Sequence, residues 1–199
     1  MGKLIYGVGV YEKGEFKSGS MVGGKWVITK EYNLWRDMLK RCYSEECHQK
    51  YPTYSGCSVS EDFKYFQRFA KWCQSQIGFG EHSYQLDKDI LYRGNKVYSE
   101  DVCVFVHSNI NSLLTKHDAA RGGCPIGVHW YRRDQNYMAQ CCIGGVRKNL
   151  GYFSTPEAAH NAYKVFKEAA IKRLANEYQP FIDPRVYSAL VNYTVSITD

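Results

Sequence analysis

The sequence lacks any run of about 18 or more consecutive apolar residues, the length that a membrane-crossing helix needs. Its first residues, MGKLIYGVGVYEKG, also lack the apolar stretch and the small-residue cleavage site of a secretory signal. No two cysteines stand in CxxC spacing, although the chain has 8 cysteines. These absences argue against a membrane protein and against a disulfide framework. We therefore expect a cytoplasmic protein whose cysteines are free thiols or metal ligands.

The sequence has fewer acidic than basic residues: 20 Asp and Glu against 26 Lys and Arg, which gives a net charge of +6 and a pI near 8.8. This balance fits a polyanionic partner, but a merely basic surface explains it as well. The aromatic content of 15% argues against disorder. A length of 199 residues suffices for one compact domain or two small ones.

Residues 1–29 are rich in glycine and predict an irregular lead segment with at most one pair of strands. Beyond them, YNLWRDMLKRCY carries apolar residues at helical spacing, and so does SEDFKYFQRFAKWCQSQ, for which Ser60 is a suitable N-cap. The next pattern, in LDKDILYRGNKVYSEDVCVFV, predicts a short strand that ends at Asp87, a polar turn, and a second apolar stretch leading to a helix near Ser108.

The segment DAARGGCP has the composition of a linker, and we place a domain boundary there. Three short strand candidates follow, namely IGVHWYRR, YMAQCCI and KNLGYF. A helix then begins with Ser154 or Thr155 as N-cap and Pro156 in its first turn. Residues 121–176 therefore predict a three-stranded antiparallel sheet covered by one helix, with one sheet face open. The tail, residues 177–199, is expected to pack back onto the body.

Side chains alternate along a strand, so Val128 and Trp130 are expected on one face and His129, Tyr131 and Arg133 on the other. In the second strand the small Ala139 and Cys141 suit the face beneath the helix, which turns Met138, Gln140 and Cys142 outward. The open face then presents cationic, amide and aromatic groups, which are partners for phosphates and base edges. A solvated polar sheet face is the alternative.

The stretch IGVHWYRRDQNYMAQCCIGGVRKNLGYFSTPEAAHNAY resembles the AP2 DNA-binding domain. It has a Gly-Val opening, an aromatic-x-Ala strand, a Leu-Gly-x-Phe strand, a Thr-x-Glu-Ala-Ala start to its helix and a closing Ala-Tyr. The resemblance implies that outward strand residues contact bases in the major groove of double-stranded DNA. Several arginines of that family are replaced here, so a different target sequence is expected. The residues that the resemblance assigns to DNA are His129, Tyr131, Arg132, Arg133, Gln140, Arg147, Lys148 and Asn149.

Residues 30–118 resemble phage-encoded HNH homing endonucleases, which often carry an AP2-like domain after the nuclease. The resemblance implies an α+β fold in which a ββα-metal body precedes the small sheet, and a divalent ion, Mg²⁺ or Mn²⁺, if the nuclease is active. Asp87 matches the first metal ligand and Asn95 the loop asparagine. Lys88 stands where the general-base histidine belongs, and Val102 stands where a second ligand is usual.

A lysine is a poor replacement for that base, because its reference pKa is about 10.4 and neighbouring Asp87 and Asp89 favour its charged form. A charged Lys88 would instead suit a DNA phosphate. His107 is a further catalytic candidate if the hairpin is active. Cys42, Cys47, Cys57 and Cys103 surround this module, and some HNH proteins bind a structural zinc through four cysteines. Buried free cysteines are the alternative, which the spacing favours.

The sequence thus predicts a sequence-specific double-stranded-DNA-binding protein of phage or mobile-element origin, acting in the cytoplasm of a bacterial host. With cleavage lost, it would act by occupying its site, as a transcriptional repressor does. Two alternatives stay open: an active HNH homing endonuclease that uses a divalent metal, and a protein-interaction module. A palindromic target would imply a symmetric homodimer, an arrangement that the sequence leaves open.

Overall fold

The computed structural model describes residues 4–114 and 123–197. The chain is a mixed α+β protein with small sheets, as the sequence predicted. It divides into two compact units, Met1–Val106 and His107–Asp199. The linker expected at residues 118–125 lies mostly outside the described residues. None of the helices in the described parts of the chain is apolar over a length that would cross a bilayer.

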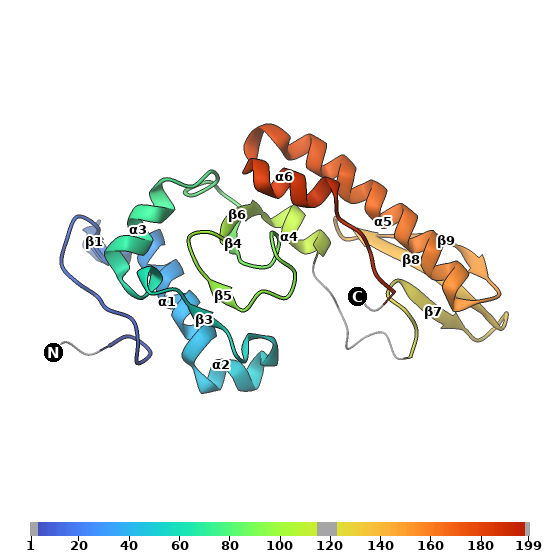
Figure 1. The fold of residues 1–199 in the computed structure, drawn as a ribbon, viewed down its shortest axis with the longest axis horizontal. Helices are drawn as coiled ribbons and strands as arrows, with labels where there is room; N and C mark the ends of the chain where they lie inside the picture. Colours follow the sequence, from blue (N-terminus) through green and yellow to red (C-terminus); the bar gives the residue numbers. More distant parts are fainter. Residues whose placement is uncertain (1–3, 115–122, 198–199) are drawn as a thin grey trace. The chain divides into compact units, whose positions relative to one another are not determined.

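The first unit begins with a hairpin and continues with helices and short strand pairs (Figure 1). Strands β3 and β5 pair in parallel, and β4 pairs with β6. The elements of this unit are β1 (Gly19–Val22), β2 (Lys25–Ile28), α1 (Lys30–Tyr43), α2 (Glu45–Lys50), η1 (Pro52–Tyr54), β3 (Ser58–Val59), η2 (Asp62–Lys64), α3 (Phe66–Gln74), β4 (Tyr84–Asp87), β5 (Val97–Tyr98) and β6 (Val104–His107).

The two apolar stripes predicted from the sequence form the core of this unit. Helix α1 buries Trp35, Met38, Leu39 and Cys42, and α3 buries its own apolar side. The Trp35 indole donates a hydrogen bond of 2.8 Å to the Phe63 carbonyl, which satisfies its one polar atom inside the core. The stripes are therefore packing surfaces.

The expected N-cap of α3 is wrong. Helix α3 begins at Phe66 with Tyr65 at its N-cap position, and Ser60 lies before the short turn η2, where its hydroxyl accepts from the Phe63 amide at 3.2 Å. The same hydroxyl donates to Glu100 at 2.8 Å. The Ser60 hydroxyl, which the sequence pattern assigned to the start of the helix, is thus bonded to Glu100 and to the amide of Phe63 in η2.

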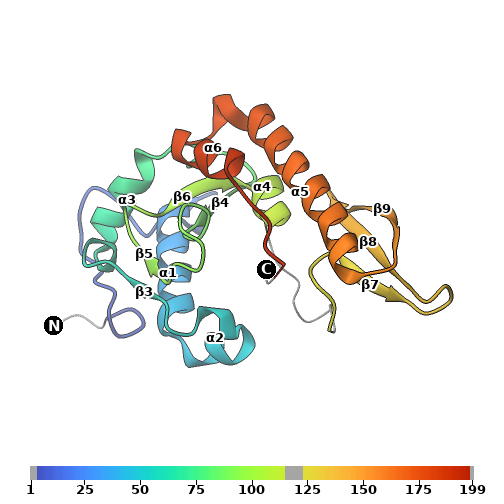
Figure 2. The same cartoon turned by 45° about the vertical axis from the view of Figure 1, so that its right-hand side comes forward.

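The second unit contains α4, an antiparallel sheet in the order β7–β8–β9, and the long helix α5, which lies along one face of that sheet (Figures 1 and 2). Thr155 is the N-cap of α5, and its side chain accepts from the Ala158 amide at 3.2 Å, so the predicted helix start is confirmed. The elements of this unit are α4 (Ser108–Leu114), β7 (Val128–Tyr131), β8 (Asn136–Ile143), β9 (Val146–Phe153), α5 (Pro156–Tyr178), η4 (Gln179–Phe181) and α6 (Pro184–Val191).

The chain after α5 packs back onto this unit. Helix α6 packs against α5. Beyond it, Val195 is buried in a cluster with Cys141 and Tyr163, and its amide donates to Glu168 at 2.8 Å. The tail therefore adds to the side of the sheet that α5 already covers.

Candidate nucleic-acid interface

The β7–β8–β9 sheet has two chemically different faces. On one face Val128, Ala139 and Cys141 are buried beneath α5, where they meet Ala159 and Tyr163. Because side chains alternate, the strand residues between these buried positions point to the other face. Within the second unit, no described helix covers that other face.

A β-bulge decides which residues of β9 reach each face. Ala139 pairs with Gly151 while the next residue, Gln140, pairs with Asn149, so β9 holds one extra residue, Leu150. Gly151 has a φ of +125°, a conformation that favours glycine, and its amide donates to the Asn149 side chain at 2.9 Å. The extra residue lets Leu150 join the core beneath α5 while Asn149 faces outward.

The face opposite α5, which we call the open face, is polar and aromatic. Arg147 pairs with Cys142, and Asn149 pairs with Gln140, so these four side chains form neighbouring rows across β8 and β9. Tyr131 and Tyr152 pack against each other at its other end, with ring centroids 5.3 Å apart and the ring planes tilted by 52°. The open face consists of His129, Tyr131, Met138, Gln140, Cys142, Arg147, Asn149 and Tyr152.

Arg133 lies beside this face, in the turn that follows β7. Its guanidinium carbon is 5.7 Å from the centroid of the Tyr131 ring, and its Nε donates to Asp134 at 2.9 Å. The side chain of Arg133 is otherwise exposed. Arg132 is also exposed in that turn.

Lys148 belongs to the opposite face. It pairs with the buried Cys141, and its ammonium lies 4.8 Å from the centroid of the Phe166 ring on α5. Of the residues that the sequence assigned to DNA on this module, Lys148 is therefore the one whose strand position turns it toward the helix. Tyr152 was not assigned, although alternation from the inward Phe153 already turns it outward. The apolar Leu150 and Phe153, three residues apart, are the sequence signal for the bulge, which changes the facing of Arg147 and Asn149.

In the first unit, Asp87, Lys88 and Asn95 lie together at the end of β4. The Asp87 Oδ1 accepts from the amides of Asp89 and Ile90, both at 2.7 Å, and so holds the turn that follows the strand. Burial raises the pKa of Asp87, and these two hydrogen bonds oppose the rise. One carboxylate oxygen of the expected metal ligand is thus engaged in a local turn.

Lys88 is buried, with 6% of its surface exposed. Its ammonium donates to both carboxylate oxygens of Asp89, at 2.8 and 2.7 Å, and to the Asn95 carbonyl at 2.7 Å. It also lies 5.7 Å from the centroid of the Tyr98 ring. A buried ammonium that bonds to Asp89 and Asn95, six residues apart in the loop after β4, is a structural cross-link. This position differs from the exposed one that a phosphate contact needs.

The other residues of the nuclease outline are engaged as well. The Asn95 amide donates to the carbonyls of Lys88 and Val97, at 2.9 and 2.7 Å, and its oxygen accepts from the Val97 amide at 3.1 Å. Val102 packs against the core of the first unit. His107 belongs to the second unit, where its ring lies 4.9 Å from the Tyr178 ring and its Nδ1 accepts from the Asn109 amide.

The four cysteines considered for zinc are buried in the first unit. Burial raises the pKa of the Cys42 and Cys103 thiols to about 12. Across residues 4–114 and 123–197, no group of three or more His, Cys, Asp or Glu side chains is arranged to hold a metal ion.

Comparison of the chain with protein-family models, with curated proteins and with solved structures gives no match. The two family resemblances therefore depend on the sequence motifs alone.

We predict that Lys88→Met destabilises the protein by about 1–3 kcal/mol, because the half-buried Asn95 carbonyl loses its donor. Lys96→Met is the matched control, since Lys96 is an exposed lysine of the same loop. Its hydrogen bond to the Thr53 carbonyl at 2.7 Å is exposed to water, so its substitution is expected to stay within about 0.5 kcal/mol. Urea unfolding followed by circular dichroism measures both. Unchanged stability together with weaker DNA binding would instead make Lys88 a phosphate contact.

Proposed function

We propose that this protein binds double-stranded DNA in a sequence-specific manner and that the open face of the β7–β8–β9 sheet contacts the major groove. The observation that supports this proposal is the arrangement of side chains on that face. Arginine suits guanine edges, and the amides of glutamine and asparagine suit adenine edges. Arg147, Gln140 and Asn149 occupy adjacent rows of the face.

The size of the sheet also supports the proposal. The major groove is about 12 Å wide and accepts a helix or a narrow β-ribbon. Neighbouring strands lie about 4.8 Å apart, so three strands present a surface of comparable width. Two exposed cations in the turn after β7, Arg132 and Arg133, are available for contacts with phosphates along the groove.

We infer that the protein acts by occupying its site, as a transcriptional repressor, and that it has lost cleavage. Cleavage needs a base that accepts a proton and a second metal ligand. Lys88 is held by Asp89 and Asn95 in a structural contact, and Val102 carries an aliphatic side chain. An active HNH nuclease is the alternative, and a plasmid-cleavage assay distinguishes the two.

The experiment that tests the proposal is selection of bound sequences from a random or genomic pool of duplex DNA, followed by footprinting on the selected site. A single enriched motif with a protected region is expected. Absence of any enriched motif at physiological salt, with only weak salt-sensitive binding, would contradict sequence-specific recognition and leave a protein-interaction module as the better account.

We predict that Arg147→Ala weakens binding to the selected site by about 1–3 kcal/mol and relaxes the preference at one base pair. Lys148→Ala is the matched control, because the two side chains are adjacent in β9 but lie on opposite faces. It is expected to change binding to selected and scrambled duplexes by the same small factor. Fluorescence anisotropy titrations on both duplexes give the two affinities. Equal losses of specificity in the two variants would show that the open face does not contact the bases.

A second prediction uses Cys142, which is exposed on the open face, whereas Cys42, Cys47, Cys57, Cys73, Cys103 and Cys141 are buried. A bulky maleimide attached to Cys142 is expected to abolish specific binding, because it fills the space that a base pair would occupy. Cys142→Ser is the control: the unmodified variant should bind like the wild type, and maleimide treatment should leave that binding intact. Full binding by the modified wild-type protein would show that this face does not meet the duplex.

A third prediction separates repressor from nuclease. Incubation of supercoiled plasmid carrying the selected site with the protein and Mg²⁺ or Mn²⁺ is expected to leave the plasmid intact, because Lys88 and Val102 do not supply the base and the second ligand that cleavage needs. Gel electrophoresis of the plasmid detects a single nick. Metal-dependent nicking that Asp87→Ala removes would establish the nuclease and reject the repressor.

A further inference from the structure

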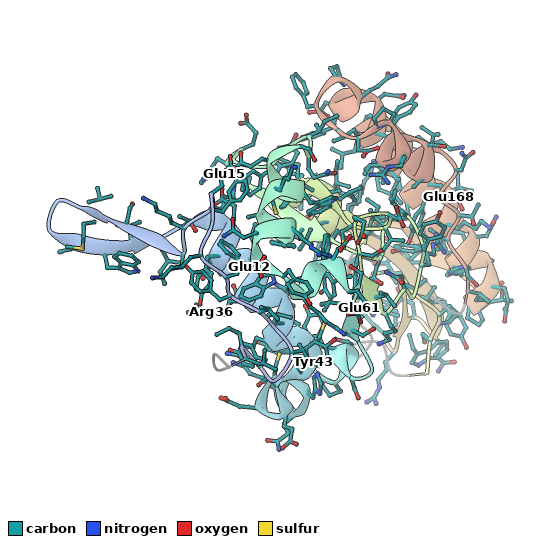
Figure 3. All side chains as sticks on the ribbon, turned by 60° about the vertical axis from the view of Figure 1, so that its left-hand side comes forward. Glu12, Glu15, Arg36, Tyr43, Glu61 and Glu168 are labelled. Carbon is teal, nitrogen blue, oxygen red and sulfur yellow. The ribbon has the colours of Figure 1, made fainter. Side chains whose placement is uncertain are left out.

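The β1–β2 hairpin extends away from the helices of the first unit, as Figure 3 shows. All of β2 is exposed, and in β1 only Gly19 is buried. An isolated two-stranded hairpin is marginally stable in water and normally packs its apolar residues against something. Here the apolar residues lie in the open, with Met21 62% and Trp26 59% exposed.

The pairing register assigns the apolar residues of this hairpin to faces. Gly19 pairs with Ile28, and Met21 pairs with Trp26, so these residues share one face, which we call the wedge face. Gly19 leaves room for the Trp26 indole, because a Cβ at Gly19 would stand 2.6 Å from that ring. The indole therefore lies over Gly19 on the wedge face.

The opposite face of the hairpin carries Val22, Lys25 and Val27. The turn between the strands is Gly23-Gly24, with φ values of +54° and +77°, so the tip has no side chains. From Phe16 to Lys30 the chain contains Lys17, Lys25 and Lys30 but no Asp or Glu. Among the described residues, no side-chain ion pair neutralises Lys17 or Lys25.

We propose that this hairpin inserts into the minor groove of the bound DNA, with its wedge face against the base pairs. The inference rests on the proposed DNA binding but concerns a contact separate from the open face. Its tip is backbone alone, because neither tip residue carries a side chain, and a groove about 6 Å wide admits it when the duplex kinks toward the major groove, as it does around inserted apolar wedges. Met21 and Ile28 are of the apolar kind that partly unstacks base steps in minor-groove complexes.

The charge of the hairpin favours DNA over a protein partner. A purely apolar partner would gain nothing from Lys17 and Lys25, whereas the walls of a DNA groove are phosphates that attract both. Lys25 begins β2 directly after the glycine tip, on the face opposite Trp26. An apolar face toward the bases and a cation on the other side, toward the backbone, match the chemistry of a groove and its wall.

The test uses the full chain on the selected duplex, with 2-aminopurine placed in turn at single positions inside and outside the footprint of the open face. Its fluorescence rises when a base step unstacks. We expect a rise at one step, together with an affinity about tenfold or more lower for the Met21→Ala, Trp26→Ala double variant. The Val22→Ala, Val27→Ala double variant, altered on the other face of the same hairpin, is expected to keep the fluorescence rise and to lose less affinity.

The outcomes separate the two proposals. The hairpin contact is overturned, while DNA recognition by the sheet stands, if the wild type binds specifically without a fluorescence rise at any step and the wedge-face variant binds with equal affinity. Failure of the wild type to bind any duplex contradicts both proposals. If the wedge-face variant turns a dimer into a monomer in sedimentation and the wild type unstacks no base, the hairpin is a protein interface and the DNA contact is rejected. The wild-type fluorescence measurement does not depend on the folding of any variant.

Discussion

The β-bulge in β9 opposite Ala139 and Gln140 decides what the sheet presents to solvent. With strict alternation from Phe153, Lys148 would face outward and Arg147 would point beneath α5. The open face would then present the ammonium of Lys148 in place of the Arg147 guanidinium, whose planar fork pairs with a guanine edge. One extra residue, made possible by the backbone of Gly151, places Leu150 in the core and Arg147 on the open face. The proposed DNA-binding surface therefore depends on this irregularity.

The loop between β4 and β5 is held by Lys88 and Asn95. The Lys88 ammonium joins the turn after β4 to the Asn95 carbonyl, and the Asn95 side chain ties the loop to β5. These contacts fix the loop through protein groups alone. A histidine at position 88 is shorter than lysine and would not supply the same three hydrogen bonds. Under the proposed HNH ancestry, lysine at position 88 stands in place of a group that can accept a proton and stabilises the loop instead.

Sequence periodicity predicted the parts of the structure that depend on local spacing. The stripes of α1 and α3, the Thr155 N-cap and the facing of Val128, Ala139 and Cys141 follow from alternation or helical repeat. The burial of Lys88 did not follow, because it depends on the loop folding back so that the Asn95 carbonyl meets the ammonium. The start of α3 was misplaced for a similar reason, since Ser60 bonds to Glu100, which lies 40 residues away.

Two DNA contacts on one chain would behave as linked sites. Once one element is bound, the other meets the duplex at an effective concentration set by the intervening chain, so the combined affinity exceeds that of either element alone. The gain appears mainly as slower dissociation, because both contacts must open before the protein leaves. For a protein that acts by occupancy, residence time on the site is the functional quantity. Under the two proposals, the base-contacting face and the groove-inserting hairpin together would lengthen residence on the site beyond what either contact gives alone.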